Sequence, residues 1–150
     1  MTTNVYLDSV LYPLCKLFKG TYSCNNIPYC EGDSSFIVNL SERFEKGTHF
    51  ICIVKRAEYV YYFDSYGLRP LNTHIIKYLH SLKIPIYYND IKIQDDNSVF
   101  CGLYCMLQVL STDTHCKINT SFKFHTHGDL SRNDDICVDY ILSIIKSMKE

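Results

Sequence analysis

Two apolar runs joined by a short polar segment most limit how this chain can fold. Residues 49–54 (HFICIV) and 59–63 (YVYYF) are rich in β-branched and aromatic residues, and KRAE between them has the length of an ordinary hairpin loop. We therefore expect an antiparallel hairpin. Simple pairing brings His49, at the start of the first strand, close to Asp64, which follows the second.

The rest of the sequence alternates between helical and extended patterns. Residues 6–19 suggest a short helix that ends at Gly20, a residue suited to a helix C-cap, and residues 21–35 have the composition of a loop. The other expected elements are strands over 36–40 and 86–93, and helices over 71–83, over 101–110 and from about 133 onward. A chain of 150 residues with this pattern fits a single α+β domain spanning residues 1–150.

The chain carries almost no net charge, −1 at pH 7. Fifteen Lys and Arg stand against sixteen Asp and Glu, so composition gives little support for binding DNA or an anionic membrane. No apolar run is long enough to span a bilayer, and the N-terminal residues 1–14 have no basic leader of the kind that opens a secretory signal. We therefore expect an intracellular protein that is neither secreted nor bound to a membrane.

Eight cysteines are many for a chain of this length. An even number can form a disulfide framework, but that framework belongs to exported proteins, so we expect reduced thiols that are mostly packed as small apolar groups. There is no C-x-x-C pair, and the only close histidines are His125 and His127, so we expect no metal site. At most one or two of the cysteines should have a thiol with a chemical role.

Four residues together offer the parts of a cysteine nucleophile. Such a thiol needs a helix N-terminus, a histidine to take its proton, a carboxylate to orient that histidine, and donors for the oxyanion. Cys101 opens an apolar helix, while His49 and Asp64 lie at one end of the hairpin. Gln94 lies in the loop seven residues before Cys101, where its amide and the Cys101 backbone N–H could face the same point.

Each of these residues also has an ordinary structural interpretation. Cys101 alone would be read as a buried helical cysteine, His49 as a strand histidine and Asp64 as a turn residue. Gln94 is the weakest assignment, because the residues 95–97 that follow it are alternatives for local hydrogen bonding. Cys105, four residues after Cys101, is interpreted as a core residue.

The ordered set of His, Asp, Gln and Cys-Gly resembles the adenain-type processing proteases and the related ubiquitin-like-protein proteases. The resemblance covers roughly residues 10–110 and favours the adenain branch, which occurs in adenoviruses and in Maverick or Polinton elements. One departure is Phe50, where family members usually have Trp. The matching segments are Gly47-Thr48-His49-Phe50, Tyr62-Phe63-Asp64-Ser65-Tyr66-Gly67, and residues 94–105 from Gln94 through Cys101-Gly102.

This resemblance implies a papain-like α+β architecture, with a mixed sheet that carries His49 and Asp64 packed against the helix that begins at Cys101. It implies a cysteine endopeptidase with Cys101 as nucleophile, His49 as base and acid, Asp64 as orienting carboxylate and Gln94 as oxyanion donor. The chemistry requires no cofactor. The family further implies viral or mobile-element precursor proteins as substrates, cleaved near small residues such as Gly, in the host cytoplasm or nucleus or in the virion. A peptide or DNA activator is also known in the family.

Two other functions stay open. The first is a protease that removes a ubiquitin-like modifier after a Gly-Gly end, with the same chemistry and a different substrate surface. The second is a catalytically silent binding module that keeps the fold, and failure of Cys101 to react as an activated thiol would favour it. Binding to DNA ranks third, and retention on DNA that depends on salt would support it.

Overall fold

A five-stranded mixed sheet forms the centre of the computed structural model, which describes residues 3–41, 49–112 and 123–149. The strands lie in chain order, with β1 parallel to β2, β4 parallel to β5, and the inner pairs antiparallel. They are β1 (Phe18–Ser23), β2 (Ser34–Asn39), β3 (Phe50–Lys55), β4 (Val60–Phe63) and β5 (Ile86–Tyr88). The expected hairpin is confirmed as β3 and β4, which pair from Cys52 with Phe63 to Lys55 with Val60.

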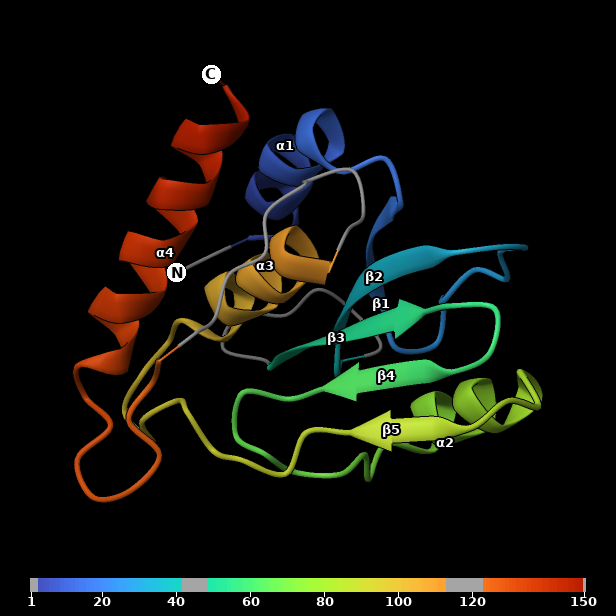
Figure 1. The fold of residues 1–150 in the computed structure, drawn as a ribbon. Coiled ribbons are helices and arrows are strands. Elements are labelled where there is room, and N and C mark those ends of the chain that lie inside the picture. The colour runs from blue at the N-terminus through green and yellow to red at the C-terminus, as the bar shows by residue number, and fades with distance from the viewer. Residues whose placement is uncertain (1–2, 42–48, 113–122, 150) are drawn as a thin grey trace.

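In the described part of the chain, four helices accompany this sheet: α1 (Asn4–Leu14), α2 (Thr73–Ser81), α3 (Cys101–Thr112) and α4 (Asn133–Met148). Figure 1 shows α1, α3 and α4 together on one side of the sheet, while α2 lies on the other side beneath β5. The α+β class expected from the sequence is confirmed, including the placement of a mixed sheet against the helix that begins at Cys101.

Alternation along β3 explains why both faces of the sheet need a cover. Phe50, Cys52 and Val54 pack into the core formed with α1, α3 and α4, whereas Ile51 and Ile53 pack into the core beneath α2. Successive side chains of a strand point to opposite faces of the sheet, so a strand with apolar residues at successive positions must be covered on both faces. The continuous apolar run that predicted this strand is the consequence of that double burial.

The expected helix over 6–19 is wrong at its C-terminal end. Helix α1 stops at Leu14, and residues 18–23 form β1 instead of a helix terminus and a loop. Gly20 is not a C-cap but lies in β1 at a break in the register with β2, with φ +123°. Parallel pairing with β2 requires a crossover connection and leaves no hairpin turn in the sequence, so the local pattern of residues 6–19 could not reveal it.

Strand β5 is also shorter than expected. The sequence predicts a strand over 86–93, but the pairing with β4 ends at Tyr88. Asn89 leaves the strand, and its side chain instead binds the backbone of Asp64. This turn directs the following loop toward the end of the β3–β4 hairpin.

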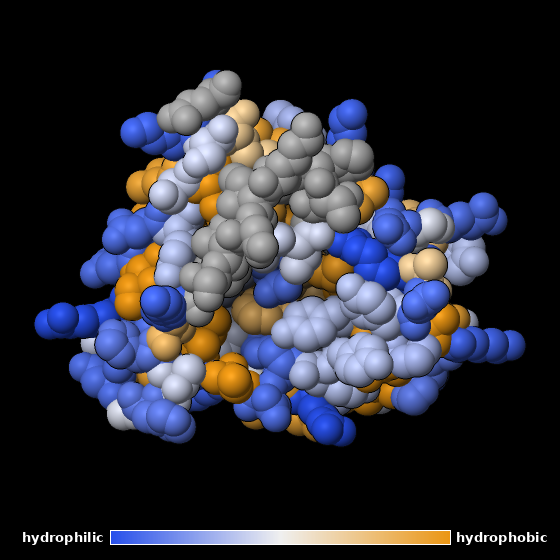
Figure 2. All heavy atoms as spheres, viewed as in Figure 1, coloured by the Kyte–Doolittle hydropathy of each residue, from blue (hydrophilic) through white to orange (hydrophobic). Residues whose placement is uncertain are grey.

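The surface in the view of Figure 2 is mixed in character. Hydrophilic and hydrophobic side chains are interspersed over the described part of this face, with small apolar groups between charged ones. Within the described residues, no helix has both the length and the apolar character needed to cross a bilayer.

Candidate active site

His49 and Asp64 meet at one end of the β3–β4 hairpin. The His49 Nε2 atom lies 2.8 Å from Asp64 Oδ1. Because a carboxylate oxygen can only accept a hydrogen bond, Nε2 carries the proton and Nδ1 is the remaining ring nitrogen. The pair is shielded from water, with the side chain of His49 18% exposed and that of Asp64 6% exposed.

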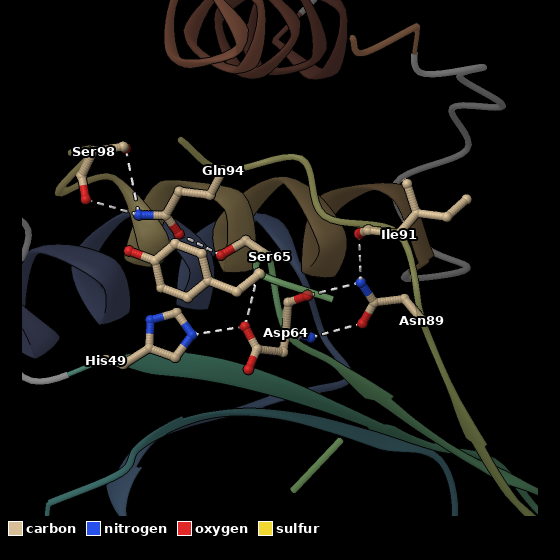
Figure 3. Close-up of polar contacts among 8 residues, drawn as sticks. His49, Asp64, Ser65, Asn89, Ile91, Gln94 and Ser98 are labelled. Atoms are coloured by element: carbon tan, nitrogen blue, oxygen red, sulfur yellow. Dashed lines mark hydrogen bonds and ion pairs between the residues drawn. The ribbon is translucent and has the colours of Figure 1, made fainter. Parts of the chain in front are cut away.

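The Asp64 residue is itself held from two sides. Its Oδ1 atom also accepts a hydrogen bond from the Tyr66 backbone N–H at 2.8 Å. The Asn89 side chain accepts from the Asp64 N–H at 2.8 Å and donates to the Asp64 carbonyl at 2.7 Å (Figure 3). Asn89 therefore replaces the strand partner that Asp64 lacks beyond the end of β4, and it fixes the backbone that carries the carboxylate.

An aromatic ring covers the imidazole. The rings of Tyr66 and His49 are stacked, with centroids 4.8 Å apart and planes inclined by 25°. The Lys92 ammonium lies 5.4 Å from the Tyr66 ring centroid and also pairs with Asp96. The stack restricts rotation of the imidazole about its side-chain bonds, in addition to the restraint from Asp64.

Cys101 reaches the same histidine from the start of α3. Burial lowers the pKa of His49, but hydrogen bonds to Asp64 and Cys101, together with their negative charges, outweigh burial and raise it to about 9. Since Asp64 binds Nε2, the free ring nitrogen Nδ1 is the one available to the thiol. The first N–H groups of a helix have no acceptors within the helix, so the terminus of α3 favours negative charge at Cys101.

Three other core cysteines, Cys52, Cys105 and Cys137, are in a different environment. Burial raises the pKa of Cys52 and Cys105 far above the ordinary value for a thiol, and it raises that of Cys137 to about 12. All three are fully buried, whereas Cys101 keeps 9% of its surface exposed. These three thiols remain protonated near neutral pH and are poor nucleophiles, as expected for core residues.

Gln94 is buried beside this group. Its side-chain carbonyl accepts a hydrogen bond from the Ser65 hydroxyl, and the Ser65 carbonyl accepts from the Gln94 backbone N–H at 3.0 Å. Its Nε2 atom donates to the Ser98 carbonyl at 3.0 Å and lies 3.3 Å from the Ser98 hydroxyl oxygen (Figure 3). Both acceptors belong to Ser98, so they can share one of the two Nε2 protons while the other remains for a different acceptor.

The alternatives to Gln94 have local roles. Asp95 accepts from the backbone of Asn97 through its carboxylate and from that of Ser98 through its carbonyl, as in an ordinary turn. Asp96 is exposed and pairs with Lys92. Among these loop residues Gln94 is the buried one, at 1% exposure.

Four residues that support the site are given no role by the sequence analysis: Ser65, Tyr66, Asn89 and Ser98. Two of them have a detectable signal in the sequence. Asn89-Asp90 is a turn-forming pair that is unfavourable inside a strand, and Ser98 stands just before a helix, where serine hydroxyls accept backbone hydrogen bonds. Tyr66 and Ser65 depend on tertiary contacts that no local pattern specifies.

Some sequence expectations cannot be placed. Gly47 and Thr48 of the segment before His49, and Cys116 among the cysteines, lie outside the described residues. Phe50, the aromatic that stands where the family usually has Trp, is buried in the core beneath α3. Within the described residues, no three His, Cys, Asp or Glu side chains are grouped so as to hold a metal ion.

Comparison with known proteins identifies similarity only at the level of solved structures. No model of a protein family matches the chain, and no curated protein matches its sequence. One similar structure is the ASFV pS273R protease, with a TM-score of 0.48, 17% identity and coverage of 73% of this chain and 43% of that one. Another is a deletion variant of AvrA with IP6 and CoA, with a TM-score of 0.47, 13% identity and coverage of 91% and 53%.

This chain therefore spans about half the length of the solved structures that it matches. Both TM-scores lie below 0.5, and neither similarity assigns a role to a residue of this chain.

Proposed function

We propose that this chain is a cysteine endopeptidase in which Cys101 is the nucleophile and His49 transfers its protons. The supporting observation is that the imidazole bound to Asp64 at 2.8 Å also has its pKa raised by the neighbouring thiol of Cys101, which opens α3. A histidine fixed by a carboxylate beside a cysteine at a helix N-terminus is the arrangement that nucleophilic thiol chemistry requires.

In the first half of the reaction, the Cys101 thiolate attacks the carbonyl carbon of a peptide bond and forms a C–S bond. The carbonyl electrons move onto oxygen, where the Cys101 N–H and the Gln94 amide N–H donate hydrogen bonds. The C–N bond then breaks as the His49 imidazolium gives its proton to the leaving amine. The product of this half is a thioester on Cys101.

The second half regenerates the thiolate. A water molecule loses a proton to the now neutral His49, and its oxygen attacks the thioester carbon. The C–S bond breaks, the carboxylic acid leaves, and the proton on His49 restores the thiolate–imidazolium pair. Asp64 stays ionised throughout, and it keeps the ring oriented and stabilises its positive form.

We further propose that the substrates are polypeptides cleaved next to small residues such as Gly. This assignment follows the motif resemblance to the adenain-type proteases, in which precursor proteins of a virus or mobile element are processed. A peptide or DNA activator and an intracellular or virion location belong to the same proposal. Removal of a ubiquitin-like modifier after Gly-Gly is the competing substrate class for the same chemistry.

Cleavage assays separate these possibilities. The purified chain is incubated with a library of Gly-containing peptides of capsid type and with a modifier fusion that ends in Gly-Gly, and the products are identified by mass spectrometry. The matched variants are Cys101→Ala, which removes the proposed nucleophile, and Cys105→Ala, which removes the buried thiol one helical turn away.

We expect the wild type and Cys105→Ala to cleave library peptides and Cys101→Ala to be inactive. Preferential cleavage of the Gly-Gly fusion would replace the precursor class with the modifier class. Cleavage that persists in Cys101→Ala, or no cleavage of either substrate by the wild type, would contradict the proposed endopeptidase.

A further inference from the structure

A chain of hydrogen bonds leads from the first turn of α4 to Gln94. The Ser98 hydroxyl donates to Asp134 Oδ1 at 2.8 Å, and the Tyr104 hydroxyl donates to the same oxygen at 2.9 Å. Ser98 in turn accepts from Gln94 Nε2 through its carbonyl at 3.0 Å, with its hydroxyl oxygen at 3.3 Å. Helix α4 thus contacts the loop before Cys101 across 36 residues of sequence.

The hydrogen-bond acceptors in this network determine where the Ser98 hydroxyl proton and the Gln94 amide protons point. A carboxylate can only accept, so the hydroxyl proton of Ser98 points to Asp134 and its lone pairs face the other way. The Ser98 hydroxyl oxygen lies 3.1 Å from the Phe100 backbone nitrogen and 3.3 Å from Gln94 Nε2, so its lone pairs can accept from both. A backbone carbonyl also only accepts, so the Gln94 atom that faces the Ser98 carbonyl must be the nitrogen.

The residue before Asp134 holds the other end of the same loop. Asn133 is fully buried, and its side chain donates to the Ile93 carbonyl at 2.7 Å and to the His125 carbonyl at 2.8 Å. Adjacent residues of α4 therefore bind the residue before Gln94 and the residue four positions after it. The first turn of α4 therefore contacts the loop on both sides of Gln94.

We propose that Asp134 is a positioning residue of the active site. It orients the Ser98 hydroxyl so that the two oxygens of Ser98 share one proton of Gln94 Nε2, and the amide is thereby held with its second proton available to the oxyanion. This inference rests on the proposed function, because it concerns a step of that reaction. Asp134 touches neither Cys101 nor His49 in this network, so its effect should be confined to stabilisation of the oxyanion.

The test compares Asp134→Ala with Asp135→Ala. Both residues are acidic and lie in the first turn of α4, but Asp135 is exposed. With the best peptide substrate, we expect Asp134→Ala to lower kcat about 10- to 100-fold with little change in KM, as for a misplaced oxyanion donor. Asp135→Ala should match the wild type, and Asp134→Asn, which keeps an acceptor oxygen, should recover most of kcat.

A double variant tests the route of the effect. If Asp134 acts through Gln94, adding Asp134→Ala to Gln94→Ala should cause no further loss of kcat. Alkylation of Cys101 by iodoacetamide forms no oxyanion. The rate of alkylation in Asp134→Ala should therefore equal that in the wild type. Should Asp134→Ala fail to fold, Ser98→Ala removes the intermediate hydroxyl alone and carries the same expectation.

Two results would overturn the positioning role. One is a kcat for Asp134→Ala or Ser98→Ala that equals that of Asp135→Ala, and the other is a full additional loss in the Gln94→Ala background. With rapid Cys101 alkylation and normal wild-type turnover, either result removes the role of Asp134 and leaves the endopeptidase in place. Slow, unselective alkylation together with an inactive wild type would instead remove the proposed function, and this inference with it.

Discussion

The Tyr66 ring lies stacked on the His49 imidazole, 4.8 Å between centroids, because the two residues face each other beyond the paired part of the β3–β4 hairpin. The same turn lets the Tyr66 backbone N–H bind Asp64 Oδ1, which also accepts the His49 proton. One hairpin end therefore supplies the histidine, its carboxylate and its cover. The reactive geometry is built by local chain reversal, and only Cys101 and Gln94 arrive from elsewhere.

The titration of His49 should be shifted to high pH. Its pKa is raised to about 9, above the ordinary 6.5, so the protonated ring stabilises the fold fully below about 6.5 and this contribution is lost as pH rises toward 9. NMR titration of the ring measures this directly. We expect Asp64→Asn and Cys101→Ala each to lower the pKa of His49, because each removes a negative charge close to the ring.

Asp90→Asn is the control for that titration, because Asp90 is an exposed carboxylate in the loop that follows Asn89. It should leave the curve of His49 in place. A ring that titrates at its ordinary value in the wild type, or one that is insensitive to Asp64→Asn, would contradict the ion-pair geometry.

Asn89→Ala should destabilise the protein more than an ordinary loop substitution. It removes the partners of the Asp64 N–H and carbonyl, and a buried backbone group without a partner costs about 1–3 kcal/mol. We expect the free energy of unfolding, measured by urea denaturation, to fall by this amount. Asn97→Ala, at an exposed position in the following loop, is the control and should change it by less than about 0.5 kcal/mol. Equal effects of the two variants would show that Asn89 does not support Asp64.

Gly67→Ala should lower the free energy of unfolding more than Gly32→Ala, although both glycines have a similar positive φ. Gly67 has φ +72°, and a Cβ there would lie 2.8 Å from the Ile91 carbonyl carbon and the Lys92 nitrogen. Gly32 has φ +76° with nothing within 4 Å of a Cβ, so Gly32→Ala carries the backbone strain alone. We expect a loss of about 1 kcal/mol for Gly32→Ala and about 2–4 kcal/mol for Gly67→Ala in thermal or urea unfolding.

The difference between Gly67→Ala and Gly32→Ala measures the cost of the close contact between Gly67 and the Ile91–Lys92 backbone. If both alanine variants lose the same stability, then the turn after Asp64 does not pack against the Ile91–Lys92 backbone as described.

Much of this arrangement follows from short-range pattern. The β3–β4 hairpin, the convergence of His49 with Asp64 and the helix that opens at Cys101 were predictable, because each depends on neighbouring residues with clear periodicity. Strand β1 was not predictable, because its parallel pairing with β2 has no hairpin turn to mark it. The contact of Asp134 with Ser98 was not predictable either, because it joins segments 36 residues apart. Their partners are specified by tertiary packing, which a local window of sequence does not contain.

Gln94 was predictable in one respect and not in another. Its position in the loop before Cys101 was predictable from the spacing, but the Ser65 and Ser98 contacts that orient its amide were not. A glutamine in a loop gives no signal for which side chains will surround it.

The central claim is that His49 activates Cys101, and thiol reactivity tests it without any choice of substrate. The native protein is treated with limiting iodoacetamide at mildly acidic pH, and the labelled cysteines are located by mass spectrometry in the wild type and in His49→Ala. We expect Cys101 to react much faster than the half-buried Cys30 in the wild type, and to lose this advantage in His49→Ala. Labelling of Cys101 that is no faster than that of Cys30, or that is unaffected by His49→Ala, would contradict the account and favour a catalytically silent module.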